Sequence, residues 1–458
     1  MWRFVFTQQC INGYINNEWL NSLHQTRIQR HSTLEAVATG YIPPNPGLKY
    51  FPLAPATAMP EAMPKTLLAL SIYLIVITAL VRLGSSLYLP AMPRMGIELQ
   101  LSSQQLAFTM TAYLAAFAGA SILMGPLCDH WGRRVLILGG IAIFFAGTLF
   151  CAVAQGYGLL LTGRLLQAVG GSAIPVATRA MTRDAFHDHQ IIGILGWIGS
   201  ITGLIPLLAP VLGGLLTQGF GWRANFYLLT AITLAIGLYA CLQTPETLPH
   251  DKRTPFKAAE TLRAYASMLV TPKFLAPLTP VMLCFAIQGA YMVSSPIIFI
   301  KLLHLTPALF GATSLALVGA ILGGRFVCMA LLKRWGVYPA YLGGSLLTFL
   351  GGALLLGFLL GRQISVLTIL APSTLYCLGF GTLLPIGIKA GLSAFPKRVG
   401  TASALLGCLT LGATALGSAV LGVLMKHSER AIEAFTLVTF VGVTFILVSS
   451  WLCRRSVS

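Results

Sequence analysis

Charged residues are scarce in this chain: only 9% of its 458 residues are Asp, Glu, Lys or Arg, against about 25% in soluble domains. Acidic residues are the scarcest, with 12 Asp and Glu against 30 Lys and Arg, which gives a net charge of +18. Hydrophobic residues make up 56% of the chain. These proportions exclude an ordinary soluble protein, and the placement of the basic residues, given below, favours a lipid bilayer over nucleic acid as the partner.

Clusters of metal-binding or catalytic side chains are also missing. The nine cysteines are scattered, without a CxxC pair or a Cys/His group at metal-ligand spacing. We therefore expect no disulfide, no metal site and no cofactor. No group of His, Glu, Ser or Cys lies at catalytic spacing, so we do not expect an enzyme. The opening run MWRFVFTQQC is too short for the apolar core of a signal peptide.

Residues 1–65 differ in composition from the rest of the chain. They are polar, and seven prolines lie between Pro43 and Pro64. This composition predicts a disordered, Pro-rich extension. The alternative is a start site assigned too early, with Met59 or Met63 as the true first residue.

Apolar stretches of about 20 residues recur from Lys65 onward, each long enough to cross a bilayer as a helix. We expect an all-α membrane protein with twelve transmembrane helices in two six-helix halves, 66–245 and 274–455, joined by a charged cytoplasmic loop over 246–273. The predicted spans are 67–91, 104–127, 135–154, 158–180, 190–216, 222–243, 275–299, 308–332, 339–361, 364–388, 399–425 and 431–453.

Basic residues predict the orientation of these spans. If both termini are cytoplasmic, 21 of the 30 Lys and Arg lie on the inside, six lie outside, and Arg82, Arg164 and Arg325 fall within spans. Omitting the extension up to Pro64 still leaves 17 inside. Because cytoplasmic loops carry the excess of Lys and Arg, we expect both termini inside.

An internal repeat relates the two halves. A shift of 204 residues aligns Trp131-Gly132 with Trp335-Gly336 and Leu138-Gly139-Gly140 with Leu342-Gly343-Gly344. The second span therefore corresponds to the eighth, in the same orientation, so the halves are related about an axis along the membrane normal. A cavity between two such halves suits alternating access.

The loop after the second span reads GPLCDHWGRR over 125–134 and resembles the GxLaDrxGrR signature of the major facilitator superfamily. The signature residues are Gly125, Asp129, Gly132, Arg133 and Arg134. Gly125 permits close helix contact and Gly132 a tight turn. An aspartate is favoured at the N-terminus of a neighbouring helix. We therefore predict that Asp129 latches onto the eleventh helix near Gly400 and holds an outward-open state.

Two further motifs strengthen the resemblance. Arg164, Gln167 and Gly171 share one face of the fourth span and match the family's RxxQxxG, and an arginine within a span is functional by default. Pro210, Gly213 and Gly214 in the fifth span resemble the antiporter signature GPxxGG, although helix packing alone would explain them equally well. Tyr88-Leu89-Pro90 and other short motifs resemble the Bcr/CflA drug exporters. This resemblance implies export of varied drugs across the bacterial inner membrane in exchange for protons.

One position departs from that branch. Its first span usually carries an acidic residue two positions before the YLP tyrosine, and here that position is Ser86. All eight histidines and 11 of the 12 acidic residues lie outside the predicted spans, and Glu433 lies at the start of the last one. Arg82, Arg164 and Arg325 are inside, so we hypothesise a cavity for an organic anion exported by membrane potential. The competing interpretation keeps proton exchange and assigns it to rim groups such as Glu98 or Asp129.

The expected substrate is an amphipathic drug or organic anion, bound in a largely apolar cavity with few polar groups. The candidate cavity residues are Arg82, Ser86, Tyr88, Tyr113, Gln167, Tyr291, Ser294 and Arg325. We expect a monomeric multidrug exporter. The alternatives are a carrier of one organic anion or siderophore-like metabolite, and a sensor or scaffold that no longer transports.

Overall fold

Long apolar stretches form helices here because a chain in lipid must satisfy its backbone hydrogen bonds internally. The computed structural model describes residues 65–186, 188–253, 255, 258–425 and 430–454, and within them it contains helices and no strands. The predicted 1–65 extension lies outside the described residues except for Lys65. Residues Met63–Ser458 form one compact unit.

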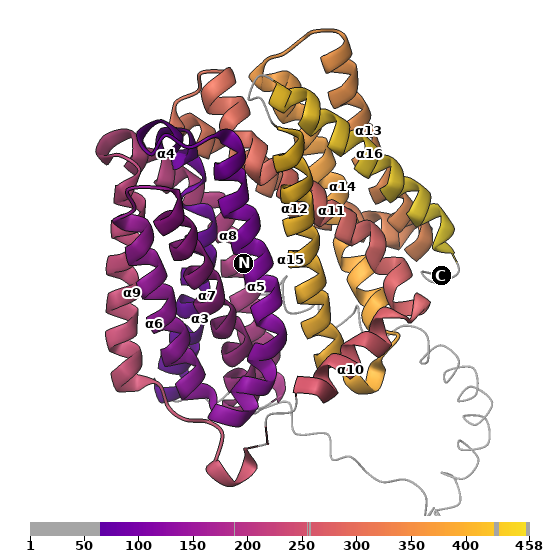
Figure 1. Cartoon of the computed structure of the whole chain (residues 1–458). Helices are drawn as coiled ribbons and strands as arrows, with labels where there is room; N and C mark the ends of the chain where they lie inside the picture. Colours follow the sequence, from indigo (N-terminus) through magenta and orange to yellow (C-terminus); the bar gives the residue numbers. More distant parts are fainter. Residues whose placement is uncertain (1–64, 187, 254, 256–257, 426–429, 455–458) are drawn as a thin grey trace, which may run out of the picture. The chain divides into compact units, whose positions relative to one another are not determined.

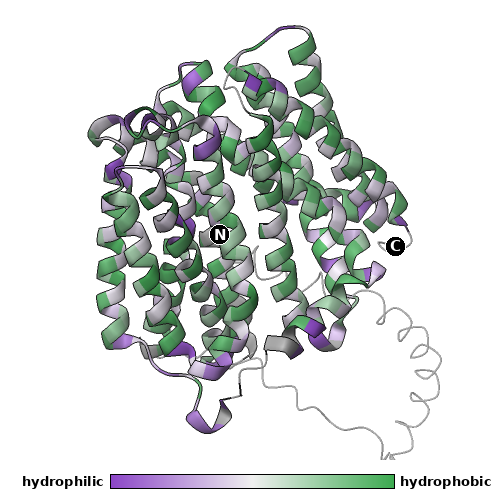
Figure 2. Cartoon of the chain, viewed as in Figure 1, coloured by the Kyte–Doolittle hydropathy of each residue, from purple (hydrophilic) through white to green (hydrophobic). Residues whose placement is uncertain are grey.

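Twelve helices among the described residues are long and apolar enough to span a membrane, which confirms the predicted number. Figure 2 shows hydrophobic residues along the helices and hydrophilic residues mainly near their ends. The spanning segments begin with α3 (Lys65–Ser86), which continues through η1 (Leu89–Ala91) and α4 (Met92–Glu98). The other spanning helices in the first half are α5 (Ser103–Trp131), α6 (Arg133–Ala152), α7 (Tyr157–Ala185), α8 (Asp188–Phe220) and α9 (Arg223–Gln243). Those in the second half are α11 (Pro272–Pro296), α12 (Pro307–Trp335), α13 (Val337–Leu360), α14 (Val366–Leu392), α15 (Val399–Leu424) and α16 (Ala431–Leu452).

Several helices are longer than the predicted spans, which corrects the placement of the acidic and histidine residues. The additional turns include Glu98, Asp129, Asp184, Asp188, His130 and His189. Each lies in the first or last turn of its helix, close to the membrane surface. Among the described residues, the middle of the spanning helices therefore still lacks a carboxylate.

Prolines explain the irregular outer ends of the first and seventh spans. The first span is broken between Ser86 and Leu89, just before Pro90 and Pro93, because proline has no amide hydrogen for the helix ladder. α11 ends at Pro296 and continues as one π-helical segment, η3 (Ile297–Leu302).

The 204-residue repeat is visible in the helix boundaries. α5 and α12 each contain 29 residues and begin 204 positions apart. Gly132 and Gly336 follow them with nearly the same left-handed backbone, at φ 97° and 86°. Glycine adopts this conformation without a Cβ penalty, so the WG pair marks the same tight turn in both halves.

One hydrophobic core joins the two halves at the outer end, which is the end opposite the Gly132 turn. It contains Tyr88, Met92 and Tyr113 from the first half with Val293, Phe310 and Phe435 from the second. Toward the inner end, each half has its own core, around Ile137 and Met181 in the first and around Phe274 and Leu405 in the second. The outer ends are thus joined by one core. The fully buried residues of the inner cores belong to one half each, and Ile122 of α5 packs against the inner core of the second half.

A short helix in the inter-half connection was not predicted. The connection contains η2 (His250–Lys252) and α10 (Ala258–Leu269), which lies beside α15 and α11 and also contacts α5. Figure 1 shows α10 at the inner end of the second half. Tyr265 and Met268 on α10 are buried in the inner core of that half. The α10 part of the connection therefore packs onto the second half.

Candidate functional site

Arg164 on α7 lies at the centre of a buried cluster built from three helices. Its guanidinium carbon is 4.2 Å from the ring centre of Tyr88 and 4.1 Å from that of Tyr113. Its Nη1 atom donates to the Gly84 carbonyl oxygen at 3.1 Å and to Gln167 Oε1 at 2.9 Å. Arg164 and Gln167 are fully buried. A cation between two aromatic faces is stabilised without a carboxylate partner, and we call Arg164, Tyr88, Tyr113 and Gln167 the Arg164 cluster.

The Arg164 cluster retains two unpaired polar atoms, Arg164 Nε and the Tyr88 hydroxyl oxygen. Gln167 Nε2 donates to Thr148 Oγ1 on α6 at 2.8 Å, so the amide is held at both ends. A Cβ on Gly171 would approach Val81 and two phenylalanine rings at 3.3 to 3.4 Å. The predicted helix face of residues 164, 167 and 171 is therefore a packing face for α3, α5 and α6.

This packing corrects part of the expected cavity. Tyr88, Tyr113 and Gln167 enclose Arg164 instead of lining an open space, and Ser86 is buried. Ser294 on α11 is also buried and donates to the Ala290 carbonyl oxygen of its own helix at 2.9 Å. In the conformation described, these five side chains are structural.

The signature loop forms a charged network at the inner end of the first half. Arg133 pairs with Asp184 at 2.8 Å and with Asp129 at 3.0 Å. Glu246 accepts the backbone N–H groups of Arg133 and Arg134 at 3.0 and 3.3 Å and so caps α6. The carboxylate on a helix N-terminus is thus Glu246, a residue that sequence spacing did not identify.

The predicted bond between Asp129 and α15 is not present in this conformation. Asp129 pairs with Arg133 on the next turn, and its side chain is half exposed. Gly125 has open space where a Cβ would lie. The close helix contact expected at Gly125 is therefore wrong for this state, and the Asp129 latch stays a prediction.

The antiporter-type motif of α8 packs at the outer end. A Cβ on Gly213 would overlap the Leu87 carbonyl oxygen within the first half. A Cβ on Gly214 would overlap the Pro307 carbonyl oxygen of α12, and one on Gly311 would overlap that of Pro210. Glycines thus allow α8 and α12, which belong to different halves, to pack backbone against backbone.

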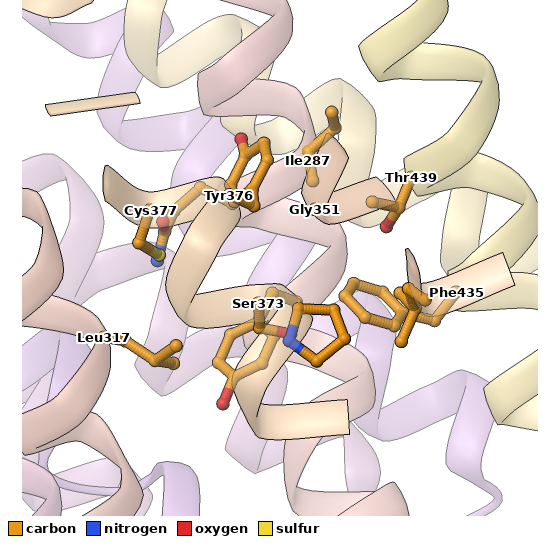
Figure 3. A pocket seen from close by; sticks show the side chains of 12 residues that line it. Ile287, Leu317, Gly351, Ser373, Tyr376, Cys377, Phe435 and Thr439 are labelled. Carbon is orange, nitrogen blue, oxygen red and sulfur yellow. The ribbon is translucent and has the colours of Figure 1, made fainter. Parts of the chain in front are cut away.

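The second half contains a small pocket with a cavity volume of about 20 Å³ in this conformation (Figure 3). Its wall is mainly apolar and aromatic and includes Tyr291, the predicted cavity residue, whose ring packs edge-on against Phe435 at 5.8 Å between centres. Thr439 also lines it, and its buried hydroxyl has no partner among the described residues. Aromatic and small polar groups of this kind suit an amphipathic molecule.

The remaining predicted arginines differ in their surroundings. Arg82 on α3 and Arg325 on α12 are exposed, and neither guanidinium group forms a hydrogen bond or ion pair with a described residue. Arg179 on α7 is also exposed, and its guanidinium group forms no hydrogen bond or ion pair with a described residue. The predicted span 158–180 already contained Arg179, but it was counted among the cytoplasmic basic residues because it lies one residue from the end of that span. It is a fourth arginine within the spanning helices.

Glu98, one of the predicted proton-handling groups, is held in a polar clamp at the outer rim. Its Oε2 atom accepts from Trp222 Nε1 at 2.7 Å and from Arg223 Nη1 at 2.9 Å. Both hydrogen bonds come from the N-terminus of α9, so Glu98 joins the outer end of α4 to α9. Its role in proton handling stays a prediction.

The sequence matches the family model described as "Major Facilitator Superfamily" over residues 74–418. The chain belongs to the major facilitator superfamily. It is therefore a membrane transporter, and its twelve apolar helices and its relatives make it a multi-pass protein of the bacterial inner membrane.

Named relatives are similar over most of their length. Multidrug resistance protein MdtL of Citrobacter koseri is 28% identical over 324 residues, which cover 71% of this chain and 81% of that protein. MdtL of Salmonella heidelberg is 28% identical over 343 residues, covering 74% and 85%.

Solved structures show the same fold at low sequence identity. A peptide transporter POT in complex with alafosfalin superimposes with a TM-score of 0.67 at 16% identity, covering 84% of this chain and 94% of that one. A bacterial homologue of the lysosomal transporter Spinster, in an inward-facing and unoccupied conformation, gives 0.66 at 15% identity, covering 86% and 98%. These similarities confirm the predicted all-helical fold.

Proposed function

We propose that this transporter exports small amphipathic molecules from the cytoplasm by alternating access, as a monomer in which residues 66–245 and 274–455 rock about each other. The observation that carries the proposal is the asymmetry of the cores. One hydrophobic core joins the outer ends, whereas the inner ends have separate cores. That arrangement is typical of an inward-facing state, in which an exporter binds its substrate from the cytoplasm.

The substrate class of a drug exporter is supported by similarity and by the pocket wall. The relatives at 28% identity are named multidrug resistance proteins. The aromatic pocket beside Tyr291 and Phe435 offers apolar contact with few polar groups. We place the chain in the Bcr/CflA branch on the Tyr88-Leu89-Pro90 and Gly221-Trp222-Arg223 motifs.

The signature loop supplies the switch in this proposal. Asp129 now pairs with Arg133 and is half exposed, so its carboxylate is available to another partner. When the inner ends come together, Asp129 accepts hydrogen bonds from the first turn of α15 near Gly400. The network of Arg133 with Asp184 keeps the loop in position during the change.

Proton exchange is the proposed driving reaction, and membrane potential is the second candidate. The described residues place no carboxylate in the middle of the spanning helices, and this favours the membrane potential as the driving force. An anion leaving a negative cell interior gains about 2.3 kcal/mol per charge per 100 mV. Glu98, which is bonded to Arg223 and Trp222, and Asp129 are the rim groups for proton handling.

Dye efflux from proteoliposomes distinguishes these possibilities. A panel of anionic, neutral and cationic dyes is loaded, and a pH gradient and then a potential are imposed separately. Stimulation by the pH gradient alone supports proton exchange, and stimulation by potential alone supports electrogenic export. No transport of any dye under either condition would contradict the exporter proposal and favour a sensor or scaffold.

A further inference from the structure

Two arginines of the first half lie near each other within the membrane-spanning helices, on α3 and α7. Thr78 Oγ1 on α3 donates to Thr178 Oγ1 on α7 at 3.4 Å, which sets the two helices at a common level. Arg82 lies one turn outward from Thr78, and Arg179 follows Thr178 directly. At about 1.5 Å per residue, the two arginines are about 7 Å apart along the helix axes, and their positive charges interact.

The neighbours of these arginines place them between the two halves. Arg82 interacts electrostatically with Tyr113 on α5. Arg179 interacts with Cys408 on α15 and with Tyr265 on α10, both of which pack with the second half. One turn further in, Arg183 Nη1 would lie 3.7 Å from a Cβ on Gly400 of α15. The row of arginines therefore faces the second half rather than lipid.

The described residues around the pair offer no counter-charge. Arg82 and Arg179 are both exposed, although residues of α5, α10 and α15 interact with them electrostatically. Neither guanidinium group forms a hydrogen bond or ion pair with a described residue. Asp184, two turns from the level of Thr178, is bound by Arg133 and by the Thr247 hydroxyl. Burial raises the pKa of Tyr265, so its phenol stays neutral at physiological pH.

Two like charges without a partner at this depth are costly, and an anion between them removes that cost. A guanidinium group suits this role because its planar N–H donors match the oxygens of a carboxylate or phosphonate. Arg164 cannot take part, since it is fully buried between Tyr88 and Tyr113. Arg325 lies on α12 without a recorded interaction with the pair.

We propose that Arg82 and Arg179 bind the anionic group of an otherwise apolar substrate, in the space between α3, α5, α7 and α15. The inference rests on the proposed export function and narrows its substrate class. Arg183 extends the positive row toward the cytoplasm and attracts the anion as it enters.

Cys408 offers a readout that needs no transport. It is partly exposed and lies beside Arg179, whereas the other described cysteines are buried, except Cys241. In a C10S/C241S background, Cys408 is labelled with the anionic sulfonatoethyl and the cationic trimethylammonioethyl methanethiosulfonate. Each rate is divided by that reagent's rate with 2-mercaptoethanol. We expect about a fivefold or greater preference for the anionic reagent.

Substitutions then test the assignment to this pair. R82Q and R179Q should bring the normalised ratio toward one, while R82K and R179K keep the charge and most of the preference. R362Q removes the same charge from an exposed outer loop and should leave the ratio unchanged. A ratio near one in the parent, or an equal loss in R362Q, would overturn the proposal.

Protection experiments identify the kind of anion. Fluorescein should slow labelling of Cys408, and rhodamine 123, a cationic dye on the same ring system, should not. Equal protection by inorganic phosphate would show a site for small inorganic anions and overturn the proposal. Loss of charge preference when phosphatidylglycerol replaces phosphatidylcholine would assign the site to a lipid headgroup and also overturn it.

Transport separates this inference from the function on which it rests. Export of fluorescein that falls at least tenfold in R82Q and R179Q, with rhodamine 123 export unchanged, supports both. Export of rhodamine 123 alone by the parent supports the exporter but contradicts the anion site. Fluorescein protection of Cys408 without export of any dye supports the site and contradicts the proposed function.

Discussion

The backbone contact between α8 and α12 predicts that one methyl group at Gly311 or Gly214 opens the outer end. In each case the added Cβ would overlap a backbone carbonyl of the other half, at Pro210 or at Pro307. Backbone atoms cannot rotate away, so the helices must separate. Inserting a carbon into a packed contact costs about 1 to 3 kcal/mol.

That cost falls on the outer-closed state alone, because the contact is absent when the outer ends part. A difference of about 1 to 3 kcal/mol shifts the balance between two states by about 5- to 150-fold. Alanine also favours a helix over glycine by up to about 1 kcal/mol, and this gain applies to both states. G311A and G214A are therefore expected to populate the outward-open state without losing the fold.

Labelling of a cysteine in the outer core measures this shift. Ala415 on α15 is 6% exposed within that core. In an A415C variant with Cys10, Cys241 and Cys408 replaced by serine, an impermeant maleimide added from outside should react faster in G311A and G214A. Gly319 on α12 and Gly203 on α8 have open space where a methyl group would be added, so G319A and G203A are matched controls. Equal rates in G311A and G319A would refute the reasoning.

Three further substitutions test the inner network and the Arg164 cluster. R164A leaves two aromatic faces and Gln167 Oε1 without their cation. The free energy of unfolding in detergent should therefore fall by about 2 to 4 kcal/mol. No loss would show that the Arg164 cluster does not stabilise the first half. E246A removes the cap of α6 and should lower the free energy of unfolding by about 1 to 2 kcal/mol. Asp251 is an exposed residue of the same connection, so D251A should leave the stability unchanged. Equal shifts of the melting temperature in the two variants would contradict the capping role of Glu246. D129N breaks the ion pair between Arg133 and the half-exposed Asp129, so the free energy of unfolding should change by less than about 1 kcal/mol. Dye export should nevertheless fall at least tenfold. Normal export by D129N would exclude the Asp129 latch.

The helix number and the internal repeat were predictable because both follow from local patterns. Hydropathy finds apolar runs, and the Trp-Gly turn after α5 recurs 204 residues later with the same backbone. Helix ends were less predictable, since α7 continues past its apolar core to Ala185. Arg179, one residue from the end of the predicted span, therefore lies more than one turn inside the helix.

The partners of the site residues could not be predicted from spacing. The 3.6-residue period placed Arg164 and Gln167 on one face, and the structure confirms their hydrogen bond. The two rings around Arg164 come from α5 and from the break after α3, and no periodicity relates them to α7. Glu246 caps a helix that begins 113 positions earlier in the chain, a contact that only the folded connection creates.

Alternating access is tested most directly by locking the outer end. Thr111 on α5 and Ser418 on α15 belong to different halves, and their hydroxyl oxygens lie 2.6 Å apart. A T111C/S418C disulfide fits this separation. Oxidation should stop dye export from proteoliposomes, and reduction should restore it, with T111C and S418C alone unaffected. Export that continues after complete disulfide formation would contradict passage of substrate through the outer end.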